Sequence, residues 1–550
     1  MQQSQPFQTS FDFVVVGAGT AGCLLANRLS ADPRNKVLLL EAGGRDDYLW
    51  VHIPVGYLYC IGNPRTDWLF QTTPQERLAG RSLKYPRGRV WGGCSSINGM
   101  IYMRGQQHDY DHWASVTGDD RWSWQNILPI FKRSEDYHGG ASEFHGSGGE
   151  WRVEQQRLRW DVLDAFRDAA AQTGIPTVTD FNRGDNEGCA YFEVNQKDGF
   201  RWNTPKAFLK DARRQGNLTI MTGSHVERLI LQSDEKGIRC SGVEFSGGGK
   251  LWRATAAYET VLCAGAIGSP QILQNSGVGP TQLLQRHQIS PIVSMPGVGQ
   301  NLQDHLQLRL VFKVTGAKTL NTMASTWWGK VAIATEYLIR RSGPMSMAPS
   351  QLGLFTRSDA SQTRANIQYH VQPLSLDKFG EPLHEFPAFT ASVCNLRPSS
   401  RGSVEIASSD PYRPPNISLN YLATVDDQKV AADAIRLTRK IAQAPALQRF
   451  APQEFKPGKA LVTDEQLVKA AGDIGTTIFH PVGTCKMGVS NDPTAVVDSE
   501  LRVLGVAALR VVDASVMPTI TSGNCNSPVI MIAERVADLI RAENHNHSPL

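Results

Sequence analysis

The sequence predicts an α/β fold (α+β overall) with two domains. One domain has a parallel sheet built from βαβ units, and the other has an antiparallel sheet flanked by helices. A βαβ pattern opens the chain, apolar and polar residues alternate between 311 and 460, and strand–loop–helix patterns return toward the C-terminus. A chain of 550 residues is long for one core, which also favours two domains. The first and last segments then form one discontinuous domain.

The opening βαβ pattern carries a glycine-rich turn. An apolar run precedes Gly17-Ala18-Gly19-Thr20-Ala21-Gly22, and a helical pattern, a second apolar run and Glu41 follow. Gly17 permits the tight turn, Gly19 lets the backbone approach a pyrophosphate, and Gly22 lets the helix pack closely on the strand. The helix start offers free N–H groups to phosphate, and Glu41 can accept hydrogen bonds from ribose hydroxyls. An ordinary strand–turn–helix is the alternative, but the spacing and the terminal acid favour a Rossmann-like dinucleotide-binding domain.

Composition and charge exclude several functional classes. The net charge of +4 is mild for this length, and no Lys/Arg block indicates a nucleic-acid partner. Nine scattered cysteines without a CxxC spacing favour a reducing compartment over a disulfide framework. Residues 1–10 lack an apolar signal core, and no apolar run reaches about 18 residues. We therefore expect a cytoplasmic protein with no metal site, and we expect the polar segment 544–550 to be a frayed tail.

A second stretch of small residues follows the loop-like segment 45–80. It reads Gly88-Arg89-Val90-Trp91-Gly92-Gly93-Cys94-Ser95-Ser96-Ile97-Asn98. So many small residues suit a backbone that lies against a planar ligand with its N–H groups toward that ligand. A flexible surface loop is the alternative, but Trp91 and Ile97 favour burial. The apolar run 259–264, with the glycine turn and helical pattern after it, adds a parallel strand to the first sheet.

The central part of the chain has a different pattern. Ile367, Tyr369 and Val371 alternate with polar residues, as do the apolar residues of 389–393. This alternation predicts antiparallel strands with one face toward water. Helices are expected at 160–171 and 426–444 and near the C-terminus. We divide the chain into a first domain of residues 8–155, 201–310 and 465–545, and a second domain of residues 156–200 and 311–464.

Four stretches in this order resemble the glucose–methanol–choline (GMC) oxidoreductase family of FAD enzymes. They are Gly17 to Gly22 with Glu41, Gly88 to Asn98, Gly265 to Gly279, and His480 to Asn524. The chain is most similar to the branch of bacterial choline dehydrogenases and aliphatic alcohol dehydrogenases, over nearly its whole length. The resemblance implies that the first domain binds FAD. The residues expected to contact FAD are Gly17, Gly19, Thr20, Ala21, Gly22, Glu41, Ala42, Arg89, Trp91, Gly92, Gly93, Ser95, Asn98, Gly99, Met100, Ile101, Val226, Ala264, Gly265, Asp513, Ala514, Asn524 and Pro528.

The resemblance also assigns particular contacts and the mode of attachment. By it, Glu41 holds the adenosine ribose, Val226 contacts the adenine through its backbone, and Asp513 with Ala514 lies near the pyrophosphate and ribityl chain. Some members attach the flavin covalently through a histidine, and choline-oxidase-like members carry that histidine where this chain has Ile97. Isoleucine has no nucleophile, so we expect a non-covalent FAD.

His480 and Asn524 are the candidate catalytic residues, separated by 44 positions. Alcohol oxidation requires removal of the hydroxyl proton, and imidazole, with a pKa of about 6.5, suits that role. An amide NH₂ can hold the substrate oxygen as it becomes an alkoxide. The two residues match the His/Asn pair of the family in identity and spacing. A hydrogen-bonded core histidine and a helix-capping asparagine are the structural alternatives.

The expected reaction is the oxidation of a primary alcohol to an aldehyde, with electrons passed to a quinone-type acceptor. An oxidase that uses O₂ and releases H₂O₂ is the alternative, and lyase, photodecarboxylase or non-catalytic flavin binding is less favoured. Decarboxylases of this fold lack the base histidine and carry a cysteine before an Arg-Pro pair, whereas this chain has Leu396 there. We expect 311–400 to form the pocket wall, with His370 and His384 as candidate liners.

The segment 327–341 has an interfacial pattern of two tryptophans, aliphatic residues and arginines. It predicts a helix that lines the substrate entrance or, as the alternative, one that docks on a membrane carrying quinone. Peripheral contact with the inner membrane is therefore a second hypothesis for localisation. The sequence is compatible with both a monomer and a dimer.

Overall fold

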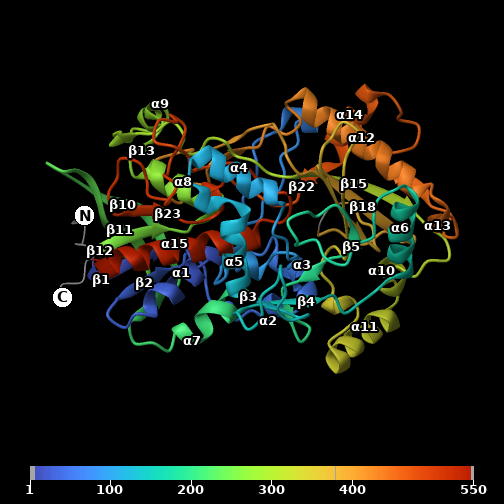
Figure 1. Ribbon diagram of the computed structural model, residues 1–550, viewed down its shortest axis with the longest axis horizontal. Coiled ribbons are helices and arrows are strands. Elements are labelled where there is room, and N and C mark those ends of the chain that lie inside the picture. The colour runs from blue at the N-terminus through green and yellow to red at the C-terminus, as the bar shows by residue number, and fades with distance from the viewer. Residues whose placement is uncertain (1–6, 378–379, 547–550) are drawn as a thin grey trace.

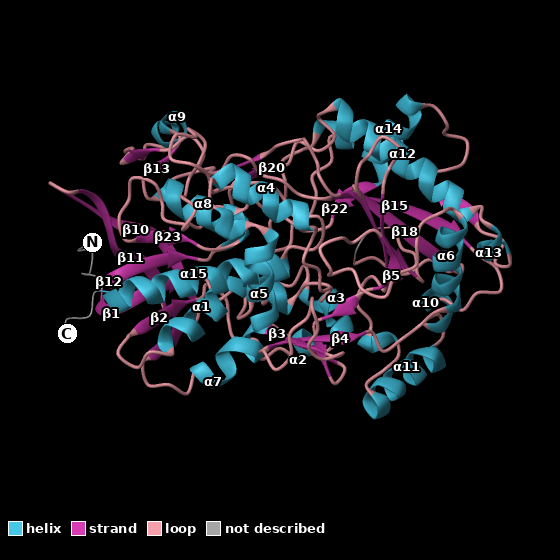
Figure 2. Ribbon diagram, in the orientation of Figure 1, coloured by secondary structure: helices cyan, strands magenta, loops and turns pink. Residues whose placement is uncertain are grey.

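The computed structural model describes residues 7–377 and 380–546 and contains two large sheets, each covered by helices. Figure 1 shows the first sheet with α1 (Thr20–Ser30) and α15 (Asn526–Asn546) at one end of the molecule. The second sheet lies at the other end with α6 (Asp161–Gln172), α12 (Val425–Ala442) and α14 (Asp464–Ile474). Figure 2 shows the strands gathered in these two regions with loops between them. The fold is the mixed α/β architecture that the sequence predicts.

The first sheet has the strand order β10-β11-β12-β1-β2-β9, with β23 paired to β12. Its core pairs β1–β2, β1–β12, β2–β9 and β12–β23 are parallel, as the βαβ pattern predicts. The whole of β2 is buried, because helices cover parallel strands on both faces. The bounds are β1 Phe7–Val16, β2 Val37–Leu40, β9 Leu218–Met221, β10 Ser224–Asp234, β11 Gly237–Gly247, β12 Lys250–Leu262 and β23 Leu509–Val511.

The second sheet has the order β21-β15-β18-β17-β16-β5, with β22 paired to β15. Every pair in it is antiparallel, which confirms the prediction from the alternating pattern. The bounds are β5 Gly188–Tyr191, β15 Leu306–Lys313, β16 Leu352–Thr356, β17 Ile367–Gln372, β18 Ala388–Asn395, β21 Gln453–Lys456 and β22 Gly475–Thr477.

The expectation that one face of this sheet contacts water is wrong. Every residue of β17 is buried, and so is every residue of β18 except Asn395. The apolar face of β17, which includes Tyr369, packs in one core with α6 and α12. His370 and Gln372, on the opposite face, line the cavity between the two sheets. Alternation distinguishes two faces of a strand, but here the polar face is covered by the other half of the protein.

Smaller elements complete the fold. The remaining helices are α2 Leu49–His52, α3 Tyr57–Cys60, α4 Gln107–Thr117, α5 Trp124–Ser134, α7 Lys210–Ala212, α8 Gly265–Asn275, α9 Thr281–Arg286, α10 Leu320–Met323, α11 Trp327–Arg340 and α13 Pro445–Gln448. The short strands are β3 Glu135–Tyr137, β4 Trp151–Gln155, β6 Glu193–Val194, β7 Gln196–Lys197, β8 Phe200–Arg201, β13 Val278–Gly279, β14 Val293–Ser294, β19 Ser403–Glu405 and β20 Asn416–Ser418. No helix of the described chain is both long enough and apolar enough to span a bilayer.

Element boundaries differ from the prediction in three places. β1 begins at Phe7, ahead of the apolar run, because its polar residues pair with the exposed start of β12. The segment 45–80, expected to be a loop, contains the short helices α2 and α3. At the C-terminus, α15 continues to Asn546, so part of the expected frayed tail is helical, and residues 547–550 lie outside the described chain. The division into domains stays a prediction, and β22 within 465–545 belongs to the second sheet.

The tight contact at Gly22 gives a test of the fold. A Cβ at this position would lie 1.9 Å from the carbonyl oxygen of Gly17. Gly22→Ala should therefore lower the free energy of unfolding by about 1–3 kcal/mol, a typical cost of overpacking. Gly216→Ala is the matched control, because a Cβ there meets no atom within 4 Å. Thermal unfolding of the two variants measures the difference, and equal midpoints would contradict the predicted contact.

Candidate active site and cofactor channel

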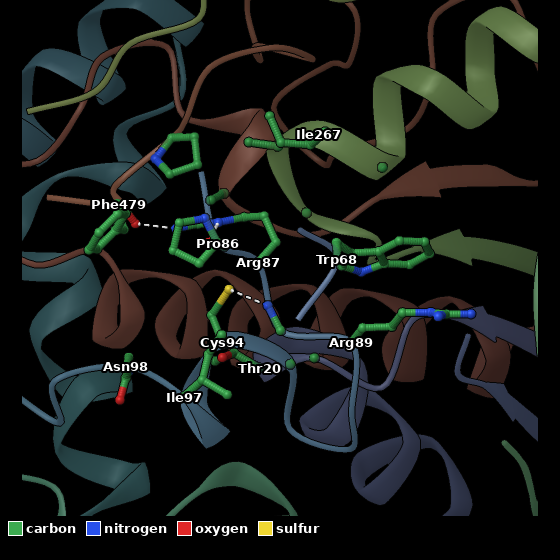
Figure 3. Close-up of a pocket in the computed structure, with 18 of the residues that line it drawn as sticks. Thr20, Trp68, Pro86, Arg87, Arg89, Cys94, Ile97, Asn98, Ile267 and Phe479 are labelled. Carbon is green, nitrogen blue, oxygen red and sulfur yellow. Dashed lines mark hydrogen bonds between the residues drawn. The ribbon is translucent and has the colours of Figure 1, made fainter. Parts of the chain in front are cut away.

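A cavity of ≈ 600 Å³ lies between the two sheets. Its lining includes the glycine turn of the first sheet, the small-residue run up to Ile101, and the histidine and asparagine near the C-terminus. Figure 3 shows Cys94, Ile97 and Asn98 on one side of the cavity and Ile267 of α8 on the opposite side. The tertiary structure thus brings together segments that lie hundreds of residues apart in the sequence.

The glycine turn has the close contacts that the fingerprint predicts. Gly17 has a φ of +99°, and a Cβ there would lie 2.6 Å from the carbonyl oxygen of Cys263. The second small-residue run lies across this turn, since Gly92 donates a backbone hydrogen bond to Ala18 and a Cβ on Gly93 would lie 2.9 Å from Gly19. The backbone of one glycine segment therefore positions the other.

Glu41 is buried at the end of β2 and holds the turn beside it. Its carboxylate accepts hydrogen bonds from the N–H of Ala18 at 3.0 Å and from the N–H of Gly43 at 2.8 Å. Burial raises the pKa of Glu41 to about 7, although both hydrogen bonds act in the opposite direction. A carboxylate has about four acceptor positions, so ribose hydroxyls can still bind to the same group.

Three helix N-termini point their free N–H groups at the cavity. Thr20 opens α1 and donates a side-chain hydrogen bond of 2.7 Å to Asn526, which opens α15. Gly265 opens α8 and donates its N–H to Asp513 at 2.8 Å. The amide nitrogen Nδ2 of Asn526 is buried and has no hydrogen-bond partner in the described chain. Converging positive helix ends and an unpaired donor fit a diphosphate.

The predicted cofactor residues fall into two groups. Those that line the cavity are Gly17, Gly19, Thr20, Ala21, Glu41, Ala42, Arg89, Gly93, Asn98, Gly99, Met100, Ile101, Val226, Ala264, Gly265, Asp513, Ala514 and Asn524. Gly22, Trp91, Gly92, Ser95 and Pro528 lie behind its wall instead. Of this second group, Gly22 packs on Gly17, and the Ser95 hydroxyl donates to the carbonyl of Gly92. These residues support the cavity wall rather than form it.

His480 and Asn524 also line the cavity and lie in contact with each other. The amide nitrogen Nδ2 of Asn524 is 3.0 Å from Nε2 of His480. Gln368 of β17 donates to Oδ1 of Asn524 at 3.5 Å, which leaves the NH₂ of Asn524 toward the histidine. The backbone N–H of His480 donates to the Asp304 carboxylate at 2.7 Å. The structure therefore brings the predicted pair into contact.

A second histidine determines which nitrogen of His480 carries hydrogen. Nε2 of His305 lies 3.1 Å from the carbonyl oxygen of Leu396, and a carbonyl only accepts, so this nitrogen carries the hydrogen. Nδ1 of neutral His305 is then an acceptor, and it lies 3.1 Å from Nδ1 of His480. His480 consequently carries hydrogen on Nδ1, and the lone pair of its Nε2 accepts a hydrogen bond from the NH₂ of Asn524. His305 is a positioning residue to which the sequence analysis gave no role.

Burial keeps these imidazoles neutral. Desolvation is the largest cause that lowers the pKa of His480 well below 6.5, and His305, His370 and Arg87 lower it further. Burial likewise lowers the pKa of His305, and it lowers the pKa of His370 to about 3. A neutral His480 can accept a proton at neutral pH, as a general base requires.

Two expectations about the pocket wall have different outcomes. His370 lines the cavity, whereas His384 does not, and its ring nitrogen Nδ1 lies 3.0 Å from the Ser375 hydroxyl. Within the described chain, helix α11 contributes no residue to the cavity, so its predicted place at the entrance gains no support. The wall also begins earlier than expected, because β15 contributes Gln307 and Arg309. Polar and apolar residues alternate at the start of β15, and this alternation is the signal that could have identified both.

A cavity that joins a dinucleotide-binding glycine turn to a part-buried His/Asn pair is typical of a flavin-dependent oxidoreductase. The chain belongs to the GMC oxidoreductase family, whose profiles match residues 11–307 and 398–533. It is 40% identical to an oxygen-dependent choline dehydrogenase of Vibrio vulnificus (strain YJ016), over 97% of this chain and 94% of that protein. It is 37% identical to an alcohol dehydrogenase [acceptor] of Pseudomonas putida, over 96% of this chain and 95% of that protein.

Solved structures agree with this assignment. Pyridoxine 4-oxidase from Mesorbium loti matches with a TM-score of 0.87 and 32% identity, covering 98% of this chain and all of that one. An Aspergillus oryzae RIB40 formate oxidase, studied for its FAD modification, matches with a TM-score of 0.90 and 28% identity, over 98% of this chain and 99% of that one. The cofactor is FAD, and the converging helix ends and glycine segments described above fit its diphosphate.

The mode of FAD attachment can be tested directly. Ile97 lines the cavity at the position where some relatives carry an attaching histidine, and its side chain cannot form such a bond. Acid or heat precipitation of the holoenzyme should therefore release all the yellow chromophore into the supernatant, as measured by its absorbance. Colour retained in the washed precipitate would contradict non-covalent binding.

Proposed function

We propose that this protein oxidises a primary alcohol to an aldehyde and passes the electrons to a quinone-type acceptor. The observation that carries the proposal is the contact between His480 and Asn524 in a cavity that fits FAD. FAD supplies the site that accepts two electrons from the alcohol carbon when it is bound. The chain's own residues bind the alcohol, orient it and remove its proton.

In this proposal His480 is the general base and acts through the lone pair on Nε2. Its Nδ1–H is held by His305, so the ring cannot present the wrong nitrogen to the alcohol. The lone pair of Nε2 accepts from Asn524 in the structure, so the substrate hydroxyl takes that place, and the N–H of Asn524 then donates to the substrate oxygen as negative charge develops there. Buried surroundings strengthen both interactions, because little water competes for them.

Two classes of electron acceptor are compatible with this reaction. The Pseudomonas putida relative is described as acceptor-dependent, and other relatives as oxygen-dependent, so O₂ with release of H₂O₂ is the alternative. Trp327 and Trp328 of α11 are 67% and 75% exposed, which suits contact with a membrane that carries quinone. Comparison of the H₂O₂ yield with the rate of quinone-dye reduction separates the two classes of acceptor.

Replacement of the base tests the proposed chemistry. His480→Ala should lower the rate of alcohol-dependent flavin reduction by at least about a hundredfold, the usual contribution of a general base. The FAD content should stay normal, because His480 is not part of the dinucleotide channel. Stopped-flow measurement of flavin reduction checks this, with His384→Ala, outside the cavity, as the matched control. A near-normal rate in His480→Ala would remove this residue from the mechanism.

The pH dependence tests the histidine pair. Neutral His480 is the active form and its pKa is depressed, so flavin reduction is lost only as the pH falls through that lowered pKa, below 6.5. His305→Ala removes one of the causes that lower this pKa, so the acid limb should move to higher pH. It should also lower the rate by about tenfold, since loss of one hydrogen bond costs about 1 kcal/mol or more. If the acid limb of the pH profile of His305→Ala lay at the same pH as that of the wild type, the proposed coupling of His305 to His480 would be contradicted.

A further inference from the structure

Strand β15 presents a line of polar side chains to the cavity. Successive residues of a strand point to opposite faces, so His305, at the entry to the strand, shares a face with Gln307 and Arg309. His305 contacts His480, and both Gln307 and Arg309 line the cavity. The guanidinium of Arg309 therefore belongs to the same cavity as the proposed base, farther along the strand.

Arg309 also belongs to a polar row that crosses three strands. It pairs with Ser392 of β18, which in turn pairs with His370 of β17. Directly opposed residues point to the same face of a sheet, so all three side chains face the first half of the protein. Ser392 and His370 are 0% and 1% exposed, and neither the Ser392 hydroxyl nor either ring nitrogen of His370 has a hydrogen-bond partner in the described chain.

The charge of Arg309 is unusual because no acid balances it. Burial lowers its pKa to about 10, and the Tyr57 hydroxyl is the one titratable group that acts against this. No carboxylate of the described chain forms an ion pair with it. Arg309 is half-buried and has no described acidic partner, and removing an unpaired charge from water is costly, so a negatively charged group of a bound substrate would stabilise it.

The acidic groups around the cavity lie elsewhere. The carboxylates that line it in residues 7–377 and 380–546 are Glu41 and Asp513, and both accept backbone N–H groups beside the glycine turn and α8. Asp377 does not line the cavity and forms a salt bridge with Lys456. The carboxylate beside His480 is that of Asp304, which is buried, accepts from its neighbours and does not line the cavity, so no described carboxylate is presented to a ligand in this part of the cavity.

We propose, on the basis of the alcohol oxidation proposed above, that Arg309 binds a carboxylate of the substrate and that the protein oxidises hydroxy acids. The planar guanidinium matches a carboxylate with two parallel hydrogen bonds, and a single Arg balances a single negative charge. The ring nitrogens of His370, which also lines the cavity, supply further polar groups in the same row. A cationic alcohol such as choline is rejected because it would place a second positive charge beside Arg309.

The proposed reaction is balanced without a further reactant. The CH₂OH group of the hydroxy acid loses its hydroxyl proton to Nε2 of His480 and loses one carbon-bound hydrogen with two electrons to FAD. The product is the corresponding aldehyde acid, and its carboxylate is unchanged. The acceptor of the proposed function then receives the two electrons.

Three alcohols of related size test the substrate class. For the wild-type holoenzyme, kcat/KM for 4-(hydroxymethyl)benzoate should exceed that for benzyl alcohol, and choline should be the poorest substrate.

Arg309→Met should lower the ratio of kcat/KM for the hydroxy acid to that for benzyl alcohol by about tenfold to a hundredfold, the value of a hydrogen bond to a charged group. Arg309→Lys should give an intermediate ratio, because lysine keeps the positive charge but lacks the planar guanidinium that forms two parallel hydrogen bonds. Arg214→Met, at a 72% exposed arginine away from the cavity, is the matched control.

The possible results distinguish failure of the hydroxy-acid inference from failure of the proposed alcohol oxidation. If benzyl alcohol reduces the flavin but the carboxylate gives no advantage and Arg309→Met leaves the ratio unchanged, the hydroxy-acid inference fails while alcohol oxidation stands. If none of a panel of alcohols reduces the flavin, the proposed function itself fails. Loss of FAD absorbance from Arg309→Met would assign Arg309 to the cofactor and overturn the inference. Arg309→Glu gives a second measure, since it should raise the choline rate relative to the hydroxy-acid rate.

Discussion

The hydrogen bonds of one buried carboxylate hold the active site together. Asp304 is 3% exposed and accepts bonds from the hydroxyls of Tyr85 and Tyr421, which come from distant segments of the chain. It also accepts from Thr477 and from the backbone N–H groups of His305 and His480. A buried carboxylate needs most of its acceptor positions filled, so these segments must meet at one point. The position of both histidines depends on that requirement.

A chain of neutral, directional groups extends from this anchor to the proposed base. The carbonyl of Leu396 fixes the tautomer of His305, and His305 fixes that of His480. Gln368 then orients Asn524 toward His480. Burial enforces each of these hydrogen bonds. A polar group without a hydrogen-bond partner lowers the stability of the fold more in the interior than at the surface, where water can replace the partner. The arrangement is preorganised, so little energy is needed to reorient it during the reaction.

Much of the architecture was predictable from the sequence because it depends on local constraints. The glycine turn, the parallel strands beside it and the antiparallel pairing of β17 with β18 follow from residue size and periodicity. The pocket wall was predicted less well. A period of two separates the faces of a strand but does not say what covers each face, so the polar face of this sheet was expected to contact water. No role was predicted for Arg309 from the sequence, and it lies before the segment expected to form the pocket wall.

The sequence by itself determined the type of cofactor domain and the two residue types at the reactive end, because a glycine turn with a terminal acid and a spaced His/Asn pair have few other uses. Only the tertiary structure decided that His480 and Asn524 are in contact, which nitrogen of His480 carries hydrogen, and that Arg309 has no described acidic partner. These properties depend on distances between segments far apart in the chain, and on whether another part of the molecule excludes water. Neither quantity is encoded in local patterns of residues.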